Sequence, residues 1–277
     1  MPDTSEILRL RVLLCFLSED ETDCTVMEIA RTLREEHYSI SRAITALEKE
    51  GLISKERPRK PRLTEKGRQQ AQRYAERINI TTSHLLYEGV NMESAANDAY
   101  YWALYNTDDT MDVIRSAEEK YRVKYELRDK KQFSGAVLCK MLKDGEYQFP
   151  FIIYRENAKN GNNISMANEG FEHPCVLSIK DGTGLLRIKA VDIFANSAVT
   201  GKRMRGHVES LKYFDSGKYI NADRSGYVLS IPASALAFKN IGEGIGQILH
   251  GQVCMKIRCS VGIVHMPEST AIFTMLI

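Results

Sequence analysis

The sequence predicts an α+β protein with three parts: a winged helix-turn-helix over residues 1–74, a helical dimerisation region over 75–132 and an all-β domain, either a sandwich or a barrel, over 133–277. Three observations support this division. Apolar residues recur at helical spacing in the first half of the chain. A strongly basic segment, broken by two prolines, interrupts these helices. Short β-rich runs, separated by Asp-Gly, Asn-Gly and Ser-Gly turns, fill the second half.

The composition is that of an ordinary globular protein, with 43% hydrophobic and 27% charged residues. Six cysteines without regular spacing do not predict a disulfide framework. No apolar run reaches the roughly 18 residues of a membrane span, and the N-terminus lacks the pattern of a signal peptide. We therefore expect a reduced, cytoplasmic protein that makes no contact with a membrane.

The first domain shows the order of elements of a winged helix. Helical spacing predicts helices over 5–18, 26–34 and 39–50, with Ser39 as the N-cap of the third helix and Gly51 as its stop. Two short extended pieces with a charged tip follow, and the next helix starts at Thr64. In such a domain the third helix enters the major groove of DNA.

The exposed residues of the third helix would lie near base edges, and Arg42 is the side chain best suited to reading a guanine. The basic residues of the wing would neutralise phosphates. The predicted DNA-binding residues are Ser39, Ser41, Arg42, Thr45, Lys55, Arg57, Arg59, Lys60 and Arg62. A winged helix can also bind proteins, and that is the alternative function for this domain.

Three more helices are predicted over 64–90, 92–105 and 108–131. The second of these carries small residues that would let another helix approach closely; they are Ala95, Ala96, Ala99 and Ala103. We expect a homodimer, because palindromic operators require a protein with two-fold symmetry.

The last part of the chain contains seven β-rich runs, at 135–142, 148–155, 174–180, 185–191, 226–232, 252–264 and 271–277. Three segments, FPFIIYREN, SMANEGFEHP and AFKNIGEGIG, mix aromatic residues with Asn, Glu and Gly. Such composition favours a pocket for a small-molecule effector or a surface for a partner. Ordinary turns around a β core are the alternative interpretation. The glycine-rich GEGIG lacks the context of a phosphate loop.

Several motifs of the first 115 residues occur in a characteristic order: SISRAITALEKEGLI, RLTEKGRQQA, TTSHLLYEGV and ESAANDAYYWALYNTDD, the last with Trp102 and the acidic pair Asp108 and Asp109. In these motifs the chain resembles the diphtheria toxin repressor and manganese transport regulator family. The resemblance implies a dimeric, metal-dependent transcriptional repressor. It covers about 40% of the chain and does not extend into the β-rich part.

The resemblance also shows a departure at the metal site. The positions of four ligands of the family carry Ile78, Tyr100, Ala103 and Leu104 here. These side chains offer no imidazole, carboxylate or thiolate to Fe(II), Mn(II) or Zn(II). His84 follows Ile78 by more than one helical turn and is expected to be a packing or surface residue. We therefore expect that the interhelical metal site is lost and that no metal cofactor is needed.

Other metal or catalytic chemistry is weakly indicated. His173 and Cys175 offer two possible metal ligands on one loop, whereas a zinc site needs three or four. No Ser-His-Asp or Cys-His arrangement emerges in the β-rich part. The sequence thus predicts a DNA-binding transcriptional regulator that is not an enzyme, with a possible small-molecule effector on the β domain. The alternative is an enzyme or a metal-sensing protein whose active or metal site lies in that domain.

Overall fold

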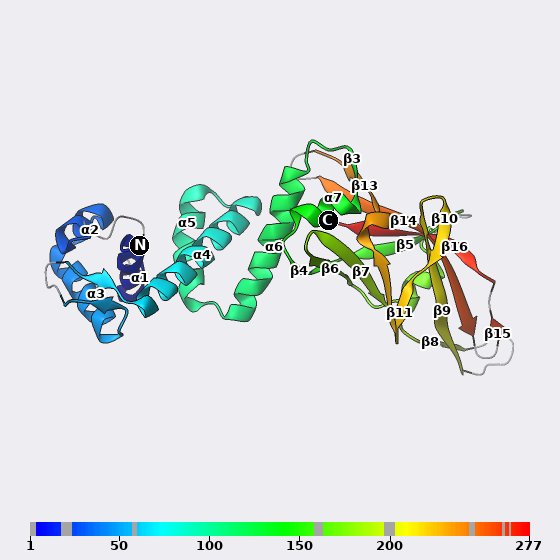
Figure 1. Ribbon diagram of the computed structural model, residues 1–277, viewed down its shortest axis with the longest axis horizontal. Helices are drawn as coiled ribbons and strands as arrows, with labels where there is room; N and C mark the ends of the chain where they lie inside the picture. Colours follow the sequence, from blue (N-terminus) through cyan, green and yellow to red (C-terminus); the bar gives the residue numbers. More distant parts are fainter. Residues whose placement is uncertain are drawn as a thin grey trace. The chain divides into compact units, whose positions relative to one another are not determined.

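The computed structural model describes residues 4–17, 24–56, 60–157, 163–196, 203–243, 247–261, 264–265 and 267–277. The chain forms two compact units, Met1–Glu118 and Glu119–Ile277. The first is mainly helical and the second consists mainly of β-strands (Figure 1). Among the described residues, no helix is long and apolar enough to cross a membrane.

The helical unit begins with three helices and a small two-stranded sheet. These elements are α1 (Ser5–Cys15), α2 (Val26–Leu33), α3 (His37–Lys49), β1 (Ile53–Ser54) and β2 (Arg62–Leu63). Their buried apolar side chains form one core, to which α1 contributes Val12 and Leu13, and α3 contributes Ile40, Ile44 and Leu47. The elements thus occur in the order that the sequence predicted.

The start of α3 differs from the prediction, and the assignment of Ser39 as its N-cap is wrong. The helix begins at His37, with Glu36 in the N-cap position. The cause lies in the preceding turn. Arg34 adopts a left-handed backbone conformation with φ of 56°, and its N–H bonds back to carbonyl oxygens of α2, so α2 ends sharply and α3 begins early. At the other end, Gly51 has φ of 73° and stops α3 as predicted.

Three longer helices complete the helical unit: α4 (Glu65–Tyr87), α5 (Met92–Tyr105) and the first half of α6 (Asp108–Glu126). The Thr64 hydroxyl caps α4 and also donates to the carbonyl oxygen of Gly51 at 2.7 Å. A Cβ atom at Gly67 would lie only 1.9 Å from the carbonyl oxygen of Leu52. Glycine at this position therefore allows α4 to begin directly against the segment that follows α3.

Helix α5 packs against α4 through its small residues. Ala95, Ala99 and Ala103 are 0% exposed within a single chain. The sequence prediction assigned this small-residue face to a helix of another copy of the chain. The structure instead uses it for packing within the chain, so these alanines cannot form a dimer interface.

The second half of α6 belongs to the β-rich unit, because Val123, and Leu127 directly after the helix, are part of the core of that unit. The division between the units therefore comes earlier in the chain than the predicted boundary at 132/133. Helix α7 (Gly135–Met141) follows, where the sequence predicted a strand over 135–142, and that prediction is wrong. A short apolar run fits either element, and here Leu138, Cys139 and Leu142 are buried on one side of a helix.

The strands of the β-rich unit form two antiparallel sheets, and every pair within them is antiparallel. The larger sheet contains β3 (Gln132–Ser134), β5 (Phe151–Arg155), β8 (Ile193–Asn196), β9 (Arg203–Asp215), β10 (Lys218–Asn221), β13 (Ala237–Ile241), β14 (Ile248–Val261), β15 (Val264–His265) and β16 (Ser269–Leu276). The smaller sheet has the order β11-β12-β7-β6-β4 and contains β4 (Gly145–Phe149), β6 (Cys175–Lys180), β7 (Thr183–Lys189), β11 (Asp223–Ser225) and β12 (Val228–Pro232). Two short 3-10 helices, η1 (Met166–Gly170) and η2 (Ala233–Ala235), lie in the connections.

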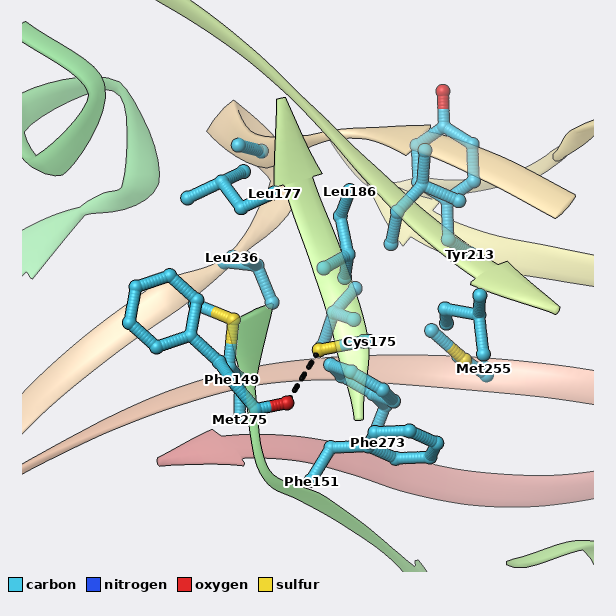
Figure 2. Packing of buried hydrophobic residues seen from close by; sticks show 14 of the residues in the cluster. Phe149, Phe151, Cys175, Leu177, Leu186, Tyr213, Leu236, Met255, Phe273 and Met275 are labelled. Atoms are coloured by element: carbon cyan, nitrogen blue, oxygen red, sulfur yellow. Dashed lines mark hydrogen bonds between the residues drawn. The ribbon is translucent and has the colours of Figure 1, made fainter. Parts of the chain in front are cut away.

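The two sheets share one apolar core. Figure 2 shows Phe149 and Leu177 of the smaller sheet in the same cluster as Met255 and Phe273 of the larger one. The predicted Asp-Gly turn at Asp181 and the Ser-Gly turn at Ser216 are confirmed. Both residues have positive φ, which is typical of the two-residue turns that join hairpin strands. Part of the glycine-rich GEGIG, 244–246, lies outside the described residues.

Candidate nucleic-acid interface

Helix α3 has a buried face and an exposed face. Ile40 and Ile44 point into the core, whereas Ser41 and Arg42 are exposed. Ser39 and Thr45 are half-buried at the edges of the exposed face. The exposed face thus presents a hydroxyl and a guanidinium, both of which form hydrogen bonds with bases or phosphates.

Tyr38 is a further residue of this face, which the sequence prediction missed. Its side chain is 68% exposed, and the guanidinium carbon of Arg42 lies 5.7 Å from the centre of its ring. Such a cation–π contact at an exposed site contributes only about 0.5 to 1 kcal/mol. The sequence placed Tyr38 in the turn before α3, because the helix was expected to start at Ser39. The correct helix start adds Tyr38 to the first turn of the exposed face.

Two of the predicted DNA-binding residues contact each other. The Lys55 ammonium donates to the Thr45 hydroxyl at 2.9 Å and pairs with the Glu48 carboxylate at 2.9 Å. The Thr45 hydroxyl in turn donates to the carbonyl oxygen of Ser41 at 2.9 Å. These bonds attach the residue that follows β1 to α3. They also partly neutralise the charge of Lys55, which leaves it less suited to binding phosphate than the sequence suggested.

Two of the other predicted cations are described: Arg62 lies in β2 and Lys60 just before it. Ser54 of β1 pairs with Arg62 of β2, and both Lys60 and Arg62 are exposed. Arg57 and Arg59 lie outside the described residues. At the start of α4, Lys66 is exposed and its ammonium donates to the carbonyl oxygen of Glu50 at 3.0 Å. Positive charge therefore follows the exposed end of α3 along the chain, from β1 to the first turn of α4.

A buried arginine lies beside the positions where the resemblance places metal ligands. The Arg77 guanidinium donates to the carbonyl oxygens of Ala103 at 2.9 Å and of Asn106 at 3.1 Å, and it pairs with the Asp108 carboxylate. Arg73 binds the same carboxylate. Hydrogen bonds from Arg73 and then Arg77 lower the pKa of Asp108. Arg77 thus joins α4 to the end of α5 and the start of α6.

The residues at the four ligand positions do not fit a metal ion. Ala103 is fully buried, and Ile78, Tyr100 and Leu104 are half-buried. The His84 ring lies 6.5 Å from the Trp102 ring and is tilted against it, which is compatible with the expected packing or surface role of this histidine. Within the described part of the chain, no group of three or more His, Cys, Asp or Glu residues is arranged to hold a metal.

His173 and Cys175 do not form a pair of metal ligands. The exposed His173 ring stacks on Phe151 with a centroid distance of 4.0 Å. Cys175 is buried, and its thiol donates to the carbonyl oxygen of Phe149 at 3.2 Å. Burial raises the pKa of this thiol to about 12, which disfavours the thiolate that binds metals. This geometry argues against a metal site built on these two residues.

In the three aromatic segments of the β-rich unit, four phenylalanines pack into the core rather than facing a ligand. Phe149, Phe151, Phe171 and Phe238 are at most 3% exposed and belong to the core. The alternative interpretation, residues around a β core, fits these phenylalanines. A short apolar segment does not reveal by itself whether its aromatic residues face a ligand or the core.

Comparison with known proteins gives no match to a protein-family model and no match among curated proteins. The chain is similar to the NEAT5 domain of IsdX2, a B. anthracis hemophore solved in complex with heme, at 15% identity and a TM-score of 0.32, over 48% of this chain and 96% of that one. It is similar to T. acidophilum IdeR at 18% identity and a TM-score of 0.34, over 74% and 93%. The manganese regulator SloR is similar at 12% identity and a TM-score of 0.34, over 84% and 99%. All three TM-scores are low, so we base the proposals below on the chain's own residues.

Proposed function

We propose that this chain is a DNA-binding transcriptional regulator that acts in the cytoplasm as a homodimer. The observation that supports this most strongly is the exposed face of α3, with Arg42, followed by a two-stranded sheet with exposed Lys60 and Arg62. This order of elements and charges supports a winged helix-turn-helix. We assign no catalytic role to the β-rich unit.

In this proposal α3 lies in the major groove, where Arg42 donates two hydrogen bonds to a guanine edge. Tyr38 and Ser41 lie on the same exposed face and contact the neighbouring bases or phosphates. Lys60 and Arg62 bind phosphates of the backbone, which gives affinity without sequence preference. Lys55 has a different role, since it holds β1 against α3.

DNA binding is proposed to be independent of a transition metal. The guanidinium of Arg77 places a permanent positive charge between α4, α5 and α6, beside positions that offer no metal ligands. We expect operator affinity to be the same in a strong chelator and in added Mn(II), Fe(II) or Zn(II). A tenfold metal response that is abolished by changing Tyr100 would contradict this part of the proposal.

The dimer needs a surface other than the buried alanines of α5. Exposed apolar side chains occur on each of the longer helices of the helical unit: Leu86 is 36% exposed, Met92 62% and Val113 71%. We propose that these residues contribute to the interface between two copies. Replacing Val113 by lysine should then shift the sedimentation of the protein from dimer to monomer at micromolar concentration.

The test of DNA binding starts with selection of preferred duplexes from a random pool by the full-length protein. Arg42→Ala should weaken binding to the selected duplex by about 1 to 3 kcal/mol and relax the base preference at one position. The double variant Lys60→Ala and Arg62→Ala should weaken binding to all duplexes. It should also reduce the slope of log affinity against log salt concentration by about 2. Lys218→Ala, an exposed charge of the β-rich unit, is the matched control. Unchanged affinity in both sets of variants would overturn the proposal.

A further inference from the structure

The β-rich unit contains a hollow of about 350 Å³ that none of the predicted sites includes. It lies among the segment before β8, the first half of β9 and the turn between β11 and β12. Its polar lining comes from Asp192, Arg205, His207, Arg224 and Tyr227, and Val208 and Ala190 supply apolar surface. All of these residues belong to one compact unit.

Arg224 is held in this hollow by neutral partners. Its Nε donates to the carbonyl oxygen of Gly226 at 2.9 Å, and its Nη1 donates to those of Val208 at 3.2 Å and Glu209 at 2.5 Å. Main-chain oxygens fix the position of a guanidinium without cancelling its charge. Arg224 therefore offers a preorganised positive charge, and within the described residues its Nη2 group makes no hydrogen bond.

Arg205 and Asp192 form the other polar wall. Their ion pair has an N–O distance of 2.6 Å, and Arg205 also lies within 3.3 Å of the Tyr227 hydroxyl. Within the described part of the chain, the second carboxylate oxygen of Asp192, Oδ1, is buried and receives no hydrogen bond. A buried acceptor without a donor is costly, and a ligand that displaces the atoms covering Oδ1 and supplies a hydroxyl or N–H group would satisfy it.

The charges of the lining favour an anion. Two guanidiniums face one carboxylate, and His207 forms its hydrogen bond with the neutral hydroxyl of Ser260 at 2.9 Å. Aromatic surface lies at the rim: Tyr227 is 51% exposed, and Phe194, 53% exposed, is the partner of Arg205 in the β8–β9 ladder. Guanidinium groups and aromatic rings together suit a flat apolar body that carries a carboxylate.

We propose that this hollow binds a small aromatic carboxylic acid with a hydrogen-bond donor on its ring. The carboxylate binds Arg224, the ring packs beside Tyr227, and the donor binds Oδ1 of Asp192. The hollow is then the effector site of the regulator, a role that rests on the proposed function. Binding of the acid itself does not depend on that function.

The test is calorimetric titration of the full-length protein with three matched probes: 3-hydroxybenzoate, benzoate and 3-hydroxybenzylamine. We expect 3-hydroxybenzoate to bind most tightly, benzoate more weakly because it lacks the donor, and the amine at least tenfold more weakly because its charge is reversed. Equal affinity for the acid and the amine would overturn the proposal.

Two variants assign the binding to the hollow. Arg224→Gln should weaken binding of 3-hydroxybenzoate at least tenfold, whereas Arg224→Lys, which keeps the charge but loses the three main-chain bonds, should weaken it less. Arg258→Gln, an exposed arginine of the same unit, should bind as the wild type does. If Arg224→Gln lowers the melting temperature, Asp192→Asn is the deciding variant. It should remove the difference in affinity between 3-hydroxybenzoate and benzoate. An unchanged difference would contradict the site.

A DNA titration with and without 3-hydroxybenzoate separates the two proposals. Binding of the acid with no DNA binding at all overturns the proposed function and leaves the site standing. DNA binding by a protein that does not bind the acid overturns the site alone. A change of at least fivefold in DNA affinity that disappears in Arg224→Gln supports both.

Discussion

Each compact unit contains an arginine–carboxylate ion pair that involves its own half of α6. The two pairs differ in which member is buried. In the helical unit, the Arg77 side chain is 7% exposed and its partner Asp108 is 69% exposed. In the β-rich unit, Glu119 is 4% exposed and its partner Arg122 is 29% exposed. The buried member is thus the cation in one unit and the anion in the other.

In each unit, the buried charge also binds the main chain. Arg77 donates to two carbonyl oxygens at the end of α5. Glu119 accepts from the main-chain N–H of Lys143 at 2.9 Å and from Arg122 at 2.6 Å. A charge removed from water is tolerated only when its hydrogen-bonding groups are satisfied. The comparison teaches that each buried charge is made acceptable by main-chain groups together with its ion-pair partner.

The largest effect is expected from Glu119→Ala. The change leaves the half-buried Arg122 without its buried partner and the N–H of Lys143 without an acceptor, so we expect a loss of about 3 to 5 kcal/mol in the free energy of unfolding of the β-rich unit. Urea denaturation followed by circular dichroism measures it. Glu126→Gln is the control, because Glu126 is an exposed partner of the same Arg122 and should cost less than about 1 kcal/mol. Equal effects of the two changes would break the comparison.

Arg77→Met should destabilise the helical unit by about 1.5 to 3 kcal/mol, because one buried and one partly buried carbonyl oxygen lose a charged donor. The matched control is Arg73→Met. Arg73 binds the same Asp108 carboxylate but is 49% exposed, and it should cost less than about 1 kcal/mol. Fluorescence of Trp102, the only tryptophan, follows unfolding of the helical unit. If the two variants unfold at the same urea concentration, burial of the arginine does not determine its contribution to stability.

Each unit also contains a glycine that lies directly against a main-chain carbonyl oxygen. A Cβ atom at Gly67 would lie 1.9 Å from the carbonyl oxygen of Leu52, and one at Gly135 would lie 1.8 Å from that of Ala233. Each alanine variant should therefore cost about 1 to 3 kcal/mol in its own unit. Gly67→Ala should move the Trp102 fluorescence transition, and Gly135→Ala should leave it unchanged. A shift of that transition by Gly135→Ala would show that the units do not unfold independently.

Local signals in the sequence predicted the helices of the helical unit and several strands, but not helix α7 or the tertiary pairs. The apolar spacing of 64–90 is regular, and α4 occupies most of that range. Strand β9 was missed, because its buried residues Val208, Leu211 and Tyr213 break strict alternation. This break in the alternation of β9 lies opposite the register shift in β14, between Arg258 and Cys259. A bulge of this kind is a property of the paired strands and leaves no signal in one of them.

The candidate DNA-binding site was predictable to a similar extent. The exposed position of Arg42 follows from helical periodicity alone, and the structure agrees. The pairing of Lys55 with Thr45 and Glu48 depends on how β1 returns to α3, which periodicity does not specify. The contacts of Arg77 likewise depend on where α5 ends. Sequence patterns therefore identified the elements of the site, and the structure was needed to decide which cations are already bound.

The smallest expected effect is a difference in pH dependence between the two ion pairs. Burial acts to raise the pKa of Glu119, but the bonds from Arg122 and Lys143 outweigh it, so the pKa lies below the ordinary value of 4.5. Since the pKa is lower in the folded state, the carboxylate stabilises the unit above pH 4.5, and this contribution disappears as the pH falls through the folded value. Protonated Glu119 resembles glutamine. The unfolding free energies of wild type and Glu119→Gln should therefore differ by about 1 kcal/mol at pH 7 and converge below pH 4.5.

The pKa of Asp108 is also lowered, but its carboxylate is exposed and screened by water. Asp108→Asn should accordingly show a smaller gap from wild type, and a larger gap for Asp108 than for Glu119 would reverse the comparison.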